Sequence, residues 1–70
     1  MILAPMANRL GEYFLAVNRP QDAVDAYKEA LETFPNDIDA LTGLEKAAKA
    51  AKLPEEAAKA AAQIKSLQEQ

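Results

Sequence analysis

The chain has 70 residues, half of them hydrophobic, and a formal net charge of −3, which suits one small soluble domain. It contains no His and no Cys, so the commonest general base, the commonest metal ligand and any disulfide are excluded. The acidic balance argues against a nucleic-acid binder, because such proteins present basic surfaces to phosphates.

Two helices are predicted in the first half, because the apolar residues recur with the period of a helix and not with that of a strand. The first begins near Pro5, since proline is favoured at the first helical position, and continues to about residue 17. The second is opened by Pro20 and stopped by Pro35. The residues expected to face the core are Ala7, Leu10, Gly11, Phe14 and Val17 in the first helix, and Ala23, Val24, Tyr27, Ala30, Leu31 and Phe34 in the second.

Two further helices are predicted in the second half. Asn36 and Asp37 are favourable N-cap residues for a third helix. Pro54 opens a fourth, with acidic residues in its first turn, where they suit the helix dipole. The core-facing stripes are expected to be Ile38, Leu41, Leu44, Glu45 and Ala48, then Ala57, Ala58, Ala61, Ile64 and Leu67. The fourth helix is rich in alanine, buries less apolar area, and is expected to be the least stable element.

The two halves repeat one another at a constant offset. The separation between Pro20 and Pro54 recurs between Ala23 and Ala57 and between Leu10 and Leu44, and we call it the repeat offset. It matches the helix-turn-helix unit of about 34 residues that is typical of tetratricopeptide repeats. The first half resembles that family in the motifs Leu10-Gly11-x2-Phe14, Ala23-x3-Tyr27 and Pro35, with Ala7 in place of the opening Trp.

The second half resembles the family more loosely. Glu45 replaces the small residue, Ala48 and Ala61 replace the aromatic residues, and Glu69 stands in place of the closing proline. Terminal repeats are expected to be atypical, because one face meets water. The resemblance implies an all-α fold of four helices in two antiparallel helix-turn-helix repeats, forming a short right-handed α-solenoid. We expect a single domain over residues 1–70, with repeats at about 4–37 and 38–70, cut from a longer array or forming its C-terminal end.

The resemblance also implies a ligand site. Peptides bound by this family usually lie in a concave groove lined by the first helix of each repeat. The corresponding residues are Asn8, Arg9, Glu12 and Leu15, followed by Thr42, Lys46 and Lys49. This set is slightly basic at one end, which suits an acidic peptide segment or a C-terminal carboxylate. The alternative interpretation is an ordinary solvated helix face, as charged faces usually are.

A second candidate surface is apolar. Ile2, Leu3, Tyr13 and Val17 would contact a preceding repeat in a longer array, and without one they would form an exposed patch of the kind that marks interfaces. A homo-oligomer is therefore predicted, because two repeats fall short of the three usually needed for stability. The alternative is that residues 1–5 fold back over the first helix.

The sequence favours a protein–protein interaction scaffold that binds a protein or peptide partner, and not an enzyme. Glu55 and Glu56 are adjacent, so their side chains diverge by about 100° on a helix and cannot flank one substrate. No phosphate loop, metal-ligand spacing or nucleophile–base set is present, so no catalytic residue, cofactor or metal is predicted. No apolar run approaches the ~20 residues of a membrane span, and a soluble, cytoplasmic protein is the default. Two alternatives remain open: a structural capping or homo-oligomerisation unit, and a non-catalytic regulatory appendage of a larger enzyme.

Overall fold

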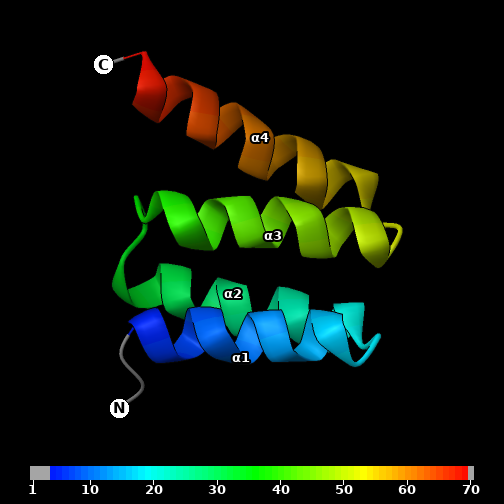
Figure 1. Cartoon of the computed structure of the whole chain (residues 1–70). Helices are drawn as coiled ribbons and strands as arrows, with labels where there is room; N and C mark the ends of the chain where they lie inside the picture. The colour runs from blue at the N-terminus through cyan, green and yellow to red at the C-terminus, as the bar shows by residue number, and fades with distance from the viewer. Residues whose placement is uncertain (1–3, 70) are drawn as a thin grey trace.

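Four α-helices form the fold in this computed structural model, which describes the backbone of residues 4–69 and the side chains of residues 8–69. They are α1 (Ala4–Ala16), α2 (Pro20–Thr33), α3 (Ile38–Ala50) and α4 (Pro54–Gln68). Figure 1 shows two antiparallel hairpins, α1 with α2 and α3 with α4, in which α1 and α3 run in the same direction. The predicted all-α fold is confirmed, and residues 4–69 contain no strand.

The turns inside the two hairpins share one backbone conformation. Asn18 and Lys52, which are separated by the repeat offset, have φ angles of 61° and 62°, in the left-handed region. The N–H of the residue after each donates to the carbonyl five positions earlier, at 2.7 Å for Arg19 to Phe14 and 2.8 Å for Leu53 to Ala48. This is the Schellman ending of a helix, which satisfies its last carbonyl groups. The offset predicted from the sequence is therefore present in the backbone.

The turn between the hairpins is fixed by an N-cap, as the Asn36–Asp37 pair predicts. The Asp37 Oδ1 accepts hydrogen bonds from the backbone N–H groups of Asp39, at 3.0 Å, and Ala40, at 3.4 Å. These bonds satisfy donors that have no partner within the helix itself. At the start of α2 and α4 neither N-cap side chain forms a hydrogen bond, and the proline in the first turn has no N–H that would need a partner.

The core consists mainly of small residues packed around one buried tyrosine. Its buried members are Ala23, Val24, Ala26, Tyr27, Ala30, Ala40, Leu41, Leu44, Ala47, Ala48, Ala57 and Ala60. Tyr27 projects from α2 and is 3% exposed. A Cβ atom on Gly11 of α1 or on Gly43 of α3 would overlap the Tyr27 ring. Because glycine has no Cβ, α1 and α3 both approach this ring closely, and the ring lies between them.

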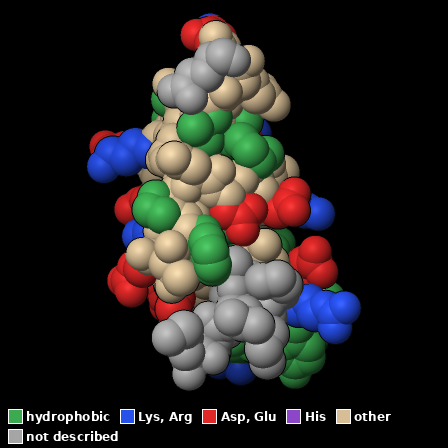
Figure 2. Space-filling view, turned by 90° about the vertical axis from the view of Figure 1, so that its left-hand side faces the viewer, with side chains coloured by type: hydrophobic (Ala, Val, Ile, Leu, Met, Phe, Trp, Pro, Cys, Tyr) green, Lys and Arg blue, Asp and Glu red, His purple; other side chains and the backbone are tan. Residues whose placement is uncertain are grey.

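Several core predictions are wrong near helix ends. Phe34 is 46% exposed and Ile38 is 37% exposed. Phe34 is the C-cap of α2, with φ of −130° and ψ of 79°, so its side chain leaves the stripe that the helix buries. Ile38 is the first residue of α3 and lies at the edge of the packed region. The end of the molecule that carries this turn shows hydrophobic side chains separated by acidic ones (Figure 2).

The outer parts of α1 and α4 also differ from the predicted stripes. Leu10 and Val17 are 38% and 43% exposed, because no described helix covers that face of α1. In α4, Ala58 is exposed and Ala60 is buried instead. The helix is inclined to α3, so that its C-terminal end lies further from α3 than its start does (Figure 1).

Two polar contacts connect α2 with α4 across the outside of the hairpins. The Lys28 Nζ lies 3.1 Å from Glu56 Oε1, and the Gln63 Nε2 donates to the Pro35 carbonyl at 2.9 Å. Both contacts are exposed, so each contributes little to stability. No helix within residues 4–69 is long and apolar enough to cross a bilayer.

Candidate functional site

A groove with a volume of about 820 Å³ runs between α1 and α3. Its lining residues are Asn8, Arg9, Glu12, Leu15 and Ala16 of α1, Asp39, Thr42, Gly43, Lys46 and Ala50 of α3, and Tyr27 of α2. The structure thus brings together most of the residues that the sequence placed in a groove, namely Asn8, Arg9, Glu12, Leu15, Thr42 and Lys46.

The two walls of the groove are made by equivalent positions of the two hairpins. Four pairs of lining residues are separated by the repeat offset: Asn8 and Thr42, Arg9 and Gly43, Glu12 and Lys46, and Ala16 and Ala50. Since α1 and α3 run in the same direction, equivalent residues lie at matching heights along the groove (Figure 1). The chain therefore builds this site by presenting one helix face twice.

The chemistry of the groove changes along its length. The residues nearest the N-terminal ends of α1 and α3 are polar or charged, those in the middle are oppositely charged, and those nearest the C-terminal ends are apolar. In that order they are Asn8, Arg9 and Asp39, then Glu12 and Lys46, then Leu15, Ala16 and Ala50. With two cations and two carboxylates, the groove is charge-balanced and not basic.

Lys49 does not line the groove, although the sequence placed it there. Its Nζ lies 3.2 Å from Glu45 Oε2, on the preceding turn of α3. Asp39 lines the groove and was not predicted. Because the groove lining contains the acidic Asp39 and lacks the basic Lys49, the expected basic end is absent.

Tyr27 and Asn8 both line the groove and contribute buried polar groups to it. Burial raises the pKa of the Tyr27 hydroxyl, and the nearby Glu12 carboxylate raises it further, so the hydroxyl is neutral at physiological pH. The Asn8 Oδ1 is buried and accepts no hydrogen bond from the described residues. A buried acceptor of this kind is a favourable partner for an N–H group that enters the groove.

The second predicted surface is only partly within the described chain. Tyr13 and Val17 are 57% and 43% exposed, while Ile2 and Leu3 lie outside the described residues. Leu10 belongs with Tyr13 and Val17, because spacings of three and four positions place all three on one side of α1. We call Leu10, Tyr13 and Val17 the outer face of α1. Leu10 was missed because it was assigned to the core.

Side chains beside the outer face are ordered by aromatic and ionic contacts. The Tyr13 and Phe14 rings are tilted, with centroids 5.6 Å apart. The Arg19 guanidinium lies 5.5 Å from the centroid of the Phe14 ring and pairs with the Asp22 carboxylate at 2.7 Å. Stacking and ion pairing therefore hold Arg19 close to the turn that ends α1.

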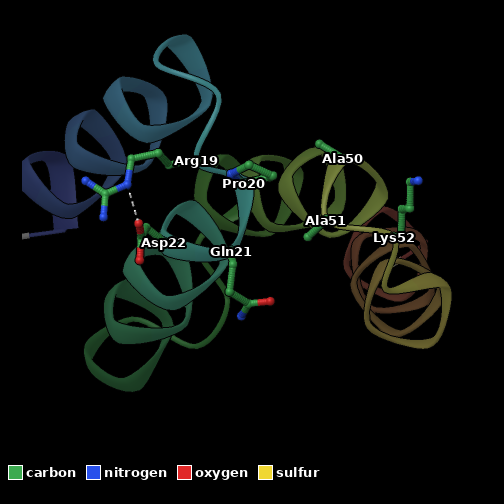
Figure 3. Close-up of a pocket in the computed structure, with 7 residues that line it drawn as sticks. All are labelled: Arg19, Pro20, Gln21, Asp22, Ala50, Ala51 and Lys52. Carbon is green, nitrogen blue, oxygen red and sulfur yellow. Dashed lines mark ion pairs between the residues drawn. The ribbon is translucent and has the colours of Figure 1, made fainter.

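A smaller hollow of about 370 Å³ lies where the two hairpin turns meet (Figure 3). Its lining residues are Arg19, Pro20, Gln21, Asp22, Ala50, Ala51 and Lys52. Figure 3 shows Arg19 and Asp22 directed toward each other and Lys52 directed away from them. The charged groups therefore lie at the rim, and the hollow itself offers little binding chemistry. Among the described residues, no cluster of acidic, His or Cys side chains could hold a metal ion.

Two helical hairpins that present the same face twice define a helical-repeat protein. A family model described as tetratricopeptide repeat matches residues 6–48. The chain therefore belongs to the tetratricopeptide repeat family. Repeats of this family generally mediate protein–protein interaction and are typically non-catalytic modules. A search of curated proteins and a search of solved structures gave no match.

Proposed function

We propose that the chain is a scaffold module that binds a segment of a partner protein in the groove between α1 and α3. The observation that supports this most directly is the construction of the groove from equivalent positions. A surface that presents the same residue positions at regular intervals suits an extended peptide, whose own side chains also recur at regular intervals.

The occupant that we propose for this charge-balanced groove is a segment with an acidic group followed by an apolar side chain. Arg9 and Lys46 are the cations that would contact a carboxylate, either of an acidic side chain or of a C-terminus. The Asn8 Oδ1 would accept a hydrogen bond from a peptide N–H. Leu15 and Ala16 would contact the apolar side chain, which loses its hydration on binding.

Lys46 and Lys49 offer a matched pair for testing this proposal. They lie one turn apart on α3, but only Lys46 lines the groove. The probes are three short synthetic peptides that differ at a single position. All three carry the same apolar residue, and the variable position holds glutamate, lysine or the neutral glutamine. Binding is followed by backbone amide NMR shifts, which also map the contacted residues.

The glutamate peptide is expected to shift the amides of groove residues and to bind more tightly than the lysine peptide. Lys46→Glu should weaken its binding about tenfold, because a direct charge contact becomes repulsive. Lys49→Glu should change binding by no more than about twofold, since an exposed charge outside the site acts only through screened attraction. Equal losses in both variants, or shifts confined to residues outside the groove, would contradict the proposal.

A further inference from the structure

The outer face of α1 corresponds to the face that α3 buries against α2. Gly43 of α3 contacts the Tyr27 ring of α2, and Ala47 follows one turn later on the same side. Ala47 is 0% exposed, and Leu44 beside it is 6% exposed. This side of α3 is therefore the surface that α3 packs against α2, and it forms one half of the α2–α3 interface.

The counterparts of these residues on α1 are exposed. The repeat offset relates Leu10 to Leu44 and Tyr13 to Ala47, and Leu10 and Tyr13 are 38% and 57% exposed. Val17 is likewise the counterpart of Ala51, which packs against the core. Apart from Arg9, which stands in place of Gly43, the first hairpin thus presents the half-interface of α3, with no described helix against it.

The other half of the same contact is exposed on α4. Lys28 of α2 extends to Glu56 of α4, so the edge of α2 that carries Lys28 faces the second hairpin. Val24 lies one turn before Lys28 on that edge and is 0% exposed. The counterpart of Val24 at the repeat offset is Ala58, which is exposed. One chain therefore carries both halves of an interface that it forms once internally, and within residues 4–69 a second pair of halves is uncovered.

We propose that the outer face of α1 packs against α4 of a second copy of this chain, head to tail, in the manner of the internal α2–α3 contact. Side-chain volumes support this pairing. Tyr13 is larger than its counterpart Ala47, and Ala58 is smaller than its counterpart Val24. A large residue on one copy therefore meets a small residue on the other, as close packing requires. The proposal does not depend on peptide binding in the groove.

The contact should be weaker than its internal equivalent. Lys65 of α4 is the counterpart of Leu31, so one apolar position of the interface becomes charged. The two faces are different surfaces, so the contact cannot close as a twofold dimer, and copies stacked in the manner of the internal contact leave a free face at either end. The chain is therefore expected to form open oligomers that lengthen with concentration.

Sedimentation equilibrium of the 70-residue chain tests this directly, at concentrations up to about 1 mM because a single helix pair makes a small interface. The weight-average mass should rise steadily above 7.6 kDa without a plateau at the dimer. Tyr13→Glu blocks one face and Ala58→Glu blocks the other, so each variant alone should be monomeric. An equimolar mixture should form a 1:1 dimer, because each variant keeps the face that the other has lost.

Two control variants separate this contact from other modes of association. The first, Ala16→Glu, changes a residue on the groove side of α1. The second, Ala62→Lys, places a lysine on α4 at the position equivalent to Lys28 of α2, whose side chain remains exposed in the internal α2–α3 contact. Both should associate like the unsubstituted chain. All four substituted positions are exposed, so helical circular dichroism should be retained throughout.

Three results would overturn the proposal. A constant monomer mass of the unsubstituted chain over the whole concentration range excludes self-association. Loss of association in Tyr13→Glu but not in Ala58→Glu indicates a symmetric contact between two α1 helices. Loss in Ala16→Glu places the contact in the groove.

Discussion

Replacing Gly43 with alanine tests the packing of the Tyr27 ring between α1 and α3. Inside a helix, alanine is favoured over glycine by about 1 kcal/mol. The substitution would therefore stabilise α3 if no neighbouring atom occupied the position of the new Cβ. Here the new Cβ would overlap Cε1 and Cζ of Tyr27 and would lie 2.8 Å from its hydroxyl oxygen. The ring is 3% exposed and already touches α1 at Gly11, so it has little room to move away.

The expected magnitude follows from two opposing effects. Overfilling a packed core costs about 1–3 kcal/mol, and the gain in helix propensity returns about 1 kcal/mol. Gly43→Ala should therefore lower the free energy of unfolding by about 1 kcal/mol. A domain of 70 residues has a total stability of roughly 3–10 kcal/mol, so the variant should remain folded and the change should be measurable.

Urea unfolding followed by circular dichroism measures this change, and a second background reveals its cause. Tyr27→Leu removes the ring atoms that the Cβ would meet, so in that background Gly43→Ala should stabilise the chain by about 0.5–1 kcal/mol. Thr42→Ala is the matched control, because Thr42 is the exposed neighbour on α3 and its substitution should stabilise the chain slightly in both backgrounds.

The decisive outcome is a change of sign in the effect of Gly43→Ala on the free energy of unfolding. The substitution should destabilise the chain that keeps Tyr27 and stabilise the chain that carries Tyr27→Leu. If Gly43→Ala stabilises the chain equally with and without the Tyr27 ring, the ring does not lie against α3. The packing described for the core would then be wrong.

Three further predictions concern the turns and the buried tyrosine. Lys52→Gly should raise the free energy of unfolding by about 1 kcal/mol in urea titrations, because a left-handed φ strains lysine but not glycine, and Asn18→Gly should gain less because asparagine tolerates that conformation. Asp37→Ala should lower the same free energy by about 1 kcal/mol, while Asp37→Ser should largely preserve it, since serine also accepts the N-cap hydrogen bond. Because the folded pKa of Tyr27 is raised, its contribution to stability is fully present below about pH 10 and is lost as the pH rises through the folded pKa, which urea midpoints at increasing pH should show.

The fold was predictable because prolines and the constant offset fix the helices. Pro20 and Pro54 mark the starts of α2 and α4, and the offset between them also relates the left-handed residues Asn18 and Lys52. No sequence pattern identified those two residues individually. Their equivalence was nevertheless implied, since equivalent helices joined by turns of equal length need the same turn.

Burial within α4 could not be predicted from its pattern. A helix in which alanine occupies both faces has no contrast in hydrophobicity, so Ala58 and Ala60 are indistinguishable by periodicity. Phe34 illustrates a different difficulty. Its spacing fits the stripe of α2, but the helix ends at Thr33, and spacing arguments fail beyond a helix end.

The groove was predicted from the family resemblance. The residues that this prediction wrongly included or left out have identifiable causes. The spacing of Glu45 and Lys49 is that of a helical ion pair, and this signal could have removed Lys49 from the set. Ala16 and Ala50 follow one turn after Glu12 and Lys46, so the same spacing could have added them. Gly43 was not placed in the predicted groove, because its contact with Tyr27 depends on tertiary structure.

Two equivalent hairpins stack in register in this fold, with the Tyr27 ring between α1 and α3. Nuclear Overhauser effects from the Tyr27 ring protons test this packing most directly. Strong effects to the α-protons of both Gly11 and Gly43 are expected, because both glycines touch the ring. Effects to only one of these glycines, or to neither, would show that the hairpins do not pack in this way.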